Sequence, residues 1–166
     1  MNRNTGRTIA AGTGIASLAL LVAMAQADSL NKMQVQNLGL GIDDATAIAL
    51  TSVAGDIIEA ELEIERNRPV WEIDIVDESK SVTSLEIDGE SGEILSSERS
   101  DDTAPAMANQ IKIDRAIELV RAMENGDITA MEMDEAGGGM VWEVDAVLAD
   151  GTPSTFRVDA QTGELL

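Results

Sequence analysis

Carboxylates occur at every second position in one stretch of this sequence, and the spacing returns a few residues later. The set comprises Glu59, Glu61, Glu63 and Glu65, followed by Glu72 and Asp74. Side chains two positions apart on a strand share a face, so these acids predict one carboxylate surface on two neighbouring strands. Such a surface suits hard divalent cations or a basic protein. The candidate metal ligands are Glu59, Glu61, Glu63, Glu72 and Asp74, and the candidate partner-binding residues are Glu61 and Glu63. We expect the strand at 59–65 to be an exposed edge of its sheet, where like charges prevent self-association and a basic or extended segment of a partner could pair.

Catalytic chemistry is difficult to build from this composition. The 166 residues include no histidine, cysteine or tyrosine, which removes the usual general base, the thiolate nucleophile and most zinc ligand sets. A carboxylate can act as an acid or base at neutral pH when burial raises its pKa, but acids on the outward side of a strand remain in water. We therefore expect a protein that is not an enzyme and needs no cofactor, with calcium as the candidate ion.

The overall charge restricts the partners. The formal net charge is −20, and a surface this acidic repels nucleic acid and anionic lipid headgroups. Like charges directly across strands destabilise a sheet, so a cation or a basic partner could offset them. The simpler interpretation is a solvated acidic face adapted to a salty habitat, where screening weakens the repulsion.

The first 27 residues have the pattern of a secretion signal. Arg3 and Arg7 give a basic start, residues 9–25 are apolar or small, and residues 25–27 (Ala-Gln-Ala) offer the small side chains that signal peptidase requires. Cleavage after Ala27 would leave no stable membrane anchor, and a chain without cysteine cannot be a lipoprotein. We therefore expect a periplasmic or secreted protein.

The chain repeats itself at an offset of 71 residues. "PVWEIDIV" at 69–76 matches "MVWEVDAV" at 140–147, and residues 42–95 match residues 113–166 without a gap at 16 of 54 positions. Such self-similarity indicates a duplicated domain. Because a copy of about 55 residues is near the lower limit for an independent core, we expect the two copies to pack together.

Each copy has the pattern of a helix followed by strands. Apolar residues recur at helical spacing at the start of both copies, with Asp43 and Asp114 as expected N-caps. Gly55 and Gly126 are the expected helix stops, because glycine readily takes the left-handed cap conformation. The period then changes to two, which predicts three strands and a short fourth. The fold class is α+β: two tandem repeats, each a helix packed on a three- to four-stranded antiparallel sheet.

The two tryptophans occupy equivalent places in the repeats. Trp71 alternates with Ile73, and Trp142 with Val144, on the face opposite the acids. This position predicts burial against the helix. The alternative is a partly exposed ring that anchors a partner peptide.

The ends of both copies resemble a known family. "FRVDAQTGELL" at residues 156–166 is similar to the terminal strand–turn–strand of PepSY domains, and "LEIDGESGEIL" at residues 85–95 is a looser version. The motif residues, in pairs across the copies, are Trp71 and Trp142, Asp88 and Asp159, and Gly92 and Gly163. The resemblance implies a cystatin-like helix on a sheet without a catalytic centre. PepSY domains occur in inhibitory propeptides of thermolysin-like secreted peptidases, so it also implies a peptidase or another exported protein as partner.

Two functions remain open at this point. The first is an exported PepSY binding protein that inhibits or regulates a secreted peptidase, and the second is an acidic module that binds divalent cations or a basic partner. The expected boundaries are a signal peptide at 1–27, a lead-in at 28–41, a first repeat at 42–95, a polar linker at 96–110 and a second repeat at 111–166.

Overall fold

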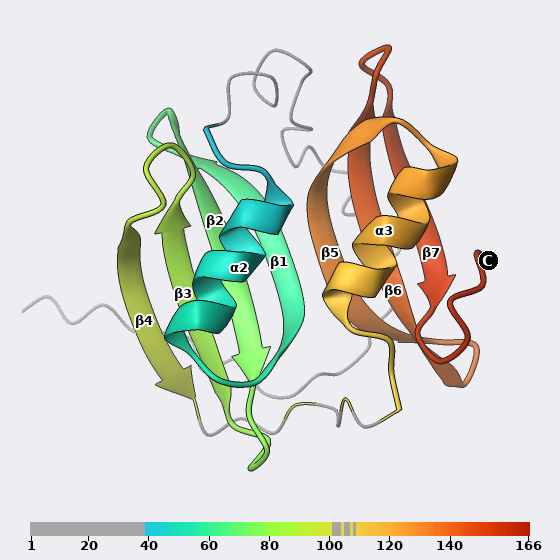
Figure 1. Ribbon diagram of the computed structural model, residues 1–166, viewed down its shortest axis with the longest axis horizontal. Helices are drawn as coiled ribbons and strands as arrows, with labels where there is room; N and C mark the ends of the chain where they lie inside the picture. The colour runs from blue at the N-terminus through green and yellow to red at the C-terminus, as the bar shows by residue number, and fades with distance from the viewer. Residues whose placement is uncertain (1–38, 101–103, 105–106, 108) are drawn as a thin grey trace, which may run out of the picture.

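The computed structural model describes residues 39–100, 104, 107 and 109–166 (Figure 1); the expected signal peptide and most of the expected lead-in lie outside these residues. The described chain forms helices and strands in a twice-repeated order. In sequence these are α2 (Ile42–Ser52), β1 (Asp56–Glu65), β2 (Arg68–Val76), β3 (Val82–Asp88), β4 (Ile94–Ser100), α3 (Ile113–Met123), β5 (Gly126–Ala136), β6 (Gly139–Leu148) and β7 (Pro153–Asp159).

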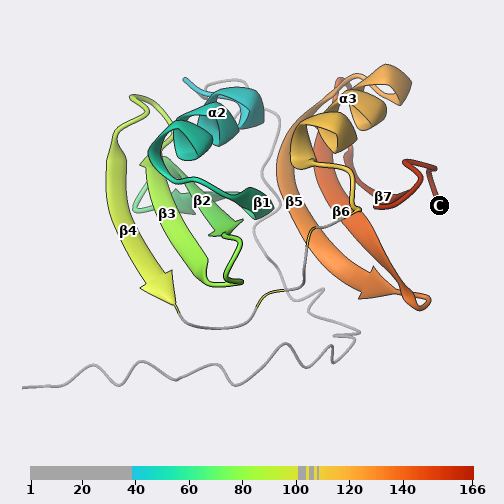
Figure 2. The same ribbon diagram turned by 60° about the horizontal axis from the view of Figure 1, so that its bottom comes forward.

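All of these strands join one antiparallel sheet in the order β4-β3-β2-β1-β5-β6-β7. Both helices lie on the same face of that sheet (Figures 1 and 2). The expected α+β class, with a helix packed on an antiparallel sheet in each repeat, is confirmed. The arrangement follows from the apolar face of each meander, which a helix must cover to exclude water.

The repeats meet at their first strands. β1 pairs with β5 through Glu59 opposite Glu132, Ala60 opposite Met131, and Glu61 opposite Ala130. Ala60 and Met131 are equivalent residues at the offset of 71, so a pseudo-twofold axis passes through this pair. A single apolar core continues under both helices, which agrees with the small size of each copy.

The helices begin two residues earlier than expected. The N-caps are Gly41 and Lys112, and neither makes a side-chain capping hydrogen bond. Ile42 and Ile113 instead begin the helices and are buried in the core. The expected caps Asp43 and Asp114 lie in the first turn, where a negative charge still interacts favourably with the helix dipole.

The expected helix stops at Gly55 and Gly126 are wrong. The helices end at Ser52 and Met123, and the C-caps Val53 and Glu124 have extended backbone. Each helix therefore ends where the backbone becomes extended, without a left-handed glycine cap. Gly55 lies just before β1 for a different reason, which is the close approach of a neighbouring strand.

The expected linker at residues 96–110 begins too early, because its first residues belong to a strand. β4 runs through Ser100 and pairs with β3 along its length, so the residues from 96 to 100 belong to the sheet. Beyond β4, Ala104 is buried against Val76 and Val82 on the face opposite the helices. In the second repeat the segment equivalent to β4 makes one bridge, between Val158 and Leu165.

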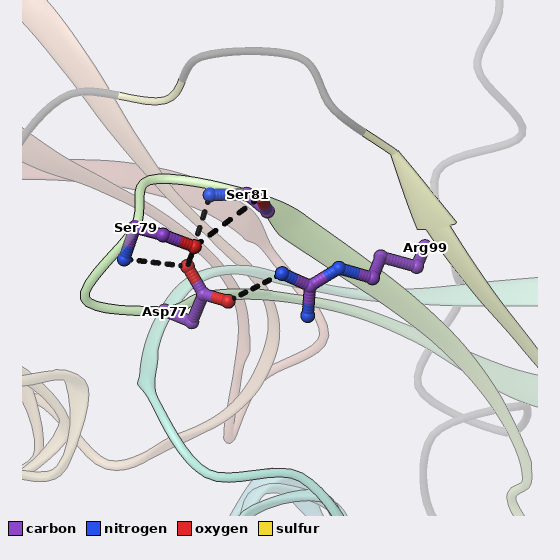
Figure 3. A network of polar contacts seen from close by, with 4 residues as sticks. All are labelled: Asp77, Ser79, Ser81 and Arg99. Carbon is purple, nitrogen blue, oxygen red and sulfur yellow. Dashed lines mark hydrogen bonds and ion pairs between the residues drawn. The ribbon is translucent and has the colours of Figure 1, made fainter.

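The turn between β2 and β3 is organised by one carboxylate (Figure 3). Asp77 Oδ1 accepts hydrogen bonds from the Ser79 hydroxyl at 2.7 Å and from the backbone N–H groups of Ser79 and Ser81, while Oδ2 pairs with Arg99 of β4 at 2.7 Å. The Ser79 hydroxyl, together with Arg99 and the backbone donors, lowers the pKa of Asp77 to about 2. These donors stabilise the ionised form.

Asp77 should therefore make stability depend on pH in acid. A carboxyl whose pKa is lower in the folded chain than its ordinary value of 3.8 stabilises the fold above that value, and this contribution disappears as pH falls through about 2. We expect the difference in melting temperature between the wild type and Asp77→Asn to shrink from pH 5 to pH 2. Glu78→Gln, in the same turn and exposed, is the control. A constant difference would contradict the prediction.

Candidate functional site

The candidate site is the sheet face opposite the helices, which we call the acidic face. Its outward side chains on the five central strands β3, β2, β1, β5 and β6 are predominantly carboxylates, because each alternates with a core residue on the helix side. They are Glu86, Glu72, Asp74, Glu59, Glu61, Glu63, Glu132, Asp134, Glu143 and Asp145. Both repeats therefore contribute to one surface.

The strand register arranges these carboxylates in two rows across the sheet. The first row runs over β2, β1, β5, β6 and β7 through Asp74, Glu59, Glu132, Glu143 and Arg157. The second runs over β3, β2, β1, β5 and β6 through Glu86, Glu72, Glu61, Ala130 and Asp145. Directly opposed side chains have Cβ atoms about 4.5–5.5 Å apart, and like charges at that spacing destabilise the sheet.

A small hollow lies where the two rows cross the junction between the repeats. Its volume is about 90 Å³. Ala130 and Met131 form part of its lining, and carboxylates supply the rest: Glu59, Glu61, Glu132, Glu143 and Asp145. Ala130 occupies the place that Glu59 has in the first repeat, so a small side chain opens space between acids.

The crowding raises the pKa of several of these groups. Burial, followed by the charges of Asp74 and Glu132, raises the pKa of Glu59 to about 7 from 4.5. Burial is also the main cause of the raised pKa of Glu61 and of Glu72, with Glu63 the next contributor to both. The pKa of Glu132 is raised by burial and then by the charge of Asp134. The face therefore resists full ionisation at neutral pH.

Neutralisation of the face is uneven between the repeats. In the second repeat Arg157 pairs with Glu143 at 2.7 Å, and the Thr155 hydroxyl donates to Asp145 at 2.6 Å. The first repeat has Glu86 in the place of Arg157 and Ser84 in the place of Thr155. Among the residues that the structure describes, no ion pair involves the central acids of the first repeat, Glu59, Glu61, Glu72 and Asp74.

The candidate metal ligands share this face but do not form a metal centre. Glu59 lies opposite Asp74, Glu61 lies opposite Glu72, and Glu63 extends the same face of β1. In the described part of the chain, no three acidic side chains converge in a way that could hold a metal ion. What the arrangement can do chemically is attract cationic groups spread over several strands.

The interpretation of β1 as an exposed edge strand is wrong. We expected the acids of β1, including Glu61 and Glu63, to protect a free edge that could accept a partner's strand. β1 instead lies at the centre of the sheet between β2 and β5, and the outermost strands are β4 and β7. Glu61 and Glu63 remain accessible on the acidic face, so any partner would contact their side chains rather than the backbone edge of β1.

Sequence reasoning missed the half of the face that comes from the second repeat. Glu132, Glu143 and Asp145 occupy the places of Glu61, Glu72 and Asp74 at the offset of 71. That equivalence was the signal in the sequence from which these acids could have been assigned to an acidic face. It could not show that the two sets adjoin, because the β1–β5 pairing that unites them is a tertiary feature.

The two motif tryptophans each stabilise the interior of their own repeat. The indole N–H of Trp71 donates to the Leu40 carbonyl at 3.2 Å, and that of Trp142 donates to the Ile111 carbonyl at 3.0 Å; both rings are fully buried. Each indole therefore joins the sheet to the segment that precedes its helix.

The final turns of the two repeats are equivalent. Asp88 Oδ1 accepts from the backbone N–H groups of Glu90 and Ser91, and Asp159 Oδ1 accepts from those of Gln161 and Thr162. Gly92 and Gly163 close these turns with φ of +77° and +76°, a conformation that favours glycine.

A fold of tandem helix-on-sheet units with this turn motif defines a class of small modular domains. The chain matches the family model of the peptidase propeptide and YPEB domain (PepSY) twice, over residues 39–98 and 110–166. The protein belongs to this family as a tandem pair of its domains.

The chain is also similar to individual proteins. It is 24% identical over 125 residues to the protein YkoJ of Bacillus subtilis (strain 168), which covers 74% of this chain and 70% of YkoJ. The crystal structure of CD1622 from Clostridium difficile 630 is 19% identical, with a TM-score of 0.47, and the match covers 82% of this chain and 96% of that one. YpmB of Bacillus subtilis is 18% identical, with a TM-score of 0.37 over 76% and 94% of the two chains.

Neither of the two helices in the described part of the chain has the length and apolar character needed to cross a membrane. The expected signal peptide precedes the described part of the chain, so export stays a prediction.

Mass spectrometry of exported protein should show that the chain starts at Asp28, and retention of residues 1–27 would contradict it.

Proposed function

We propose that this protein is an exported, non-catalytic binding protein whose acidic face holds a basic segment of another exported protein. A secreted peptidase is the partner class that the family description favours, and inhibition of that peptidase is the proposed consequence. The observation that carries the proposal is the pair of carboxylate rows, continuous across the two repeats and without ion pairs at their centre among the described residues.

Repulsion between its carboxylates makes the acidic face unfavourable for the fold. Opposed carboxylates each destabilise a sheet by up to about 1 kcal/mol. At the centre, burial and then the charges of Asp74 and Glu132 raise the pKa of Glu59. Lysine or arginine side chains of a partner, placed above the rows, would replace repulsion with attraction. An extended basic segment matches the geometry better than one metal ion, because the carboxylates extend across five strands rather than converging on a point.

The test is inhibition of secreted metallopeptidases of the source organism by the purified protein. We expect measurable inhibition that weakens with added salt, because exposed charges are screened. Replacing Glu61 and Glu63 together by lysine should weaken inhibition about tenfold, since each reversal introduces a repulsive contact with a basic segment. The matched control reverses Glu90 and Glu93, which are exposed on the β3–β4 turn away from the face.

Two results would overturn the proposal. The first is an absence of inhibition together with no partner recovered from the exported fraction. The second is equal weakening by both pairs of reversals, which would indicate an effect of net charge alone. If calcium then raised the melting temperature of the wild type but not of the Glu61→Lys, Glu63→Lys variant, the cation-binding alternative would replace the proposal.

A further inference from the structure

The strand pairing that joins the two repeats is short. β1 and β5 pair over three residue pairs, whereas β1 and β2 pair along their whole length. On the helix side, Arg121 of α3 pairs with Asp43 of α2, and both side chains are exposed, so this ion pair adds little. The stability of the junction is therefore sensitive to charge at the β1–β5 pairing.

Glu59 occupies the centre of that pairing with an acid on each side. It lies directly opposite Asp74 of β2 and directly opposite Glu132 of β5. The ionisable groups that surround it on every neighbouring strand of this face are Glu61 on β1, Glu72 and Asp74 on β2, Glu132 on β5, and Glu143 and Asp145 on β6, with Arg157 of β7 bound to Glu143. None of the groups directly opposite Glu59 is a cation.

Asp74 provides an independent observation. Its Oδ1 atom is buried and accepts no hydrogen bond from any protein group that the structure describes. The equivalent carboxylate in the second repeat, Asp145, accepts the Thr155 hydroxyl at 2.6 Å. A buried acceptor without a donor is costly, and a protonated carboxyl on Glu59, in the directly opposed position, is the donor that the geometry supplies.

We infer that Glu59 carries a proton that it donates to Asp74 across β1 and β2, and that loss of this proton loosens the junction between the repeats. Burial and the neighbouring acids disfavour the ionised form of Glu59. In the protonated state, Glu59 fills the empty acceptor on Asp74 and leaves Glu132 opposite a neutral group. In the ionised state, three adjacent carboxylates cross the centre of the sheet.

The direction of the pH effect follows from the titration of Glu59. Its pKa rises to about 7 in the folded protein from 4.5. The folded chain therefore binds more protons than the unfolded chain between those values, so the stabilisation is complete below pH 4.5 and is lost as pH rises through 7. For one linked proton, the unfolding equilibrium constant increases by up to tenfold per pH unit in that window.

The experiment first follows the side-chain carboxyl of Glu59 by carbon-13 NMR. We expect a midpoint near pH 7 in the wild type and a clearly lower midpoint in Asp74→Asn, because asparagine removes a neighbouring charge and offers a donor to the ionised Glu59. A midpoint at the ordinary value in the wild type would overturn the inference, as would an unchanged midpoint in Asp74→Asn.

The second measurement connects the proton to the junction. Between pH 5 and 7, the pH dependence of unfolding in Glu59→Gln should correspond to almost one proton fewer than in the wild type. Glu65 is an exposed acid at the end of the same strand, and Glu65→Gln should keep the wild-type dependence. Hydrogen exchange at residues 59–61 and 130–132, corrected for the intrinsic effect of pH, should accelerate as pH rises from 5 to 7, and by more than exchange in β2–β3 pairs. Equal pH dependence in all three proteins, or equal acceleration across the sheet, would overturn it.

Discussion

Replacing Trp71 or Trp142 with alanine is expected to lower the free energy of unfolding by about 3–5 kcal/mol. Each indole is fully buried in the shared core, so alanine leaves a large cavity that the sheet and helix can only partly fill. Each replacement also leaves a carbonyl without its indole donor, at Leu40 or Ile111. Because the marginal stability of a domain this size is about 5–15 kcal/mol, either change should affect the whole protein.

Urea denaturation followed by circular dichroism measures this effect. Trp71→Phe and Trp142→Phe are the matched variants, since phenylalanine keeps most of the volume and removes the N–H, and they should cost distinctly less than alanine. Indole fluorescence of the folded wild type should be that of a buried ring. Emission typical of fully solvated indole from both residues, or a loss below about 1 kcal/mol for the alanine variants, would contradict the prediction.

Replacing Gly55 with alanine should destabilise the protein by about 3 kcal/mol, although only one methyl group is added. A Cβ at this position would lie 2.6 Å from Ile75 Cγ2 and closer still to the carbonyl oxygen of Val76. A strand backbone cannot move away without breaking its pairing with β1. The φ of +156° adds strain for any side chain larger than hydrogen.

Two other glycines give matched controls for that change. Gly126 is the equivalent residue in the second repeat, but there a Cβ would lie 3.0 Å from the Val147 carbonyl oxygen, so Gly126→Ala should cost less. Gly41 has open space around it, and Gly41→Ala should have the smallest effect of the three. Thermal melting of the three variants tests the order, and a smaller loss for Gly55→Ala than for Gly126→Ala would contradict it.

Much of the fold could be predicted because its causes are local. The change from helical period to strand period is visible at residues 42–65 and again at 113–136, since side-chain burial follows backbone periodicity directly. The gapless repeat showed that both copies must share that architecture. Details at the element ends were less accessible: Gly55 was interpreted as a helix stop, whereas its role depends on a strand about twenty positions away in sequence.

Only half of the candidate site could be predicted, because the other half depends on contacts between segments that are distant in sequence. Alternation placed Glu59, Glu61, Glu72 and Asp74 on one face, and the register confirms that these acids lie opposite one another. The acids of β5 and β6 were not assigned to that face, and β1 was expected to be an edge. Neither point can be read from local sequence, because each depends on which strand the first strand of a repeat pairs with.

The sequence by itself determined the duplication, the helix-on-sheet architecture of each repeat and the alternation of acids with core residues. These features follow from short-range periodicity and from the need to bury one face of each element. Only the tertiary structure decided that β1 and β5 join the repeats into one sheet, that Glu59 lies between Asp74 and Glu132, and that both repeats form one acidic face. Strand order and register arise from packing between distant segments, where the shared core under both helices outweighs the repulsion of opposed carboxylates.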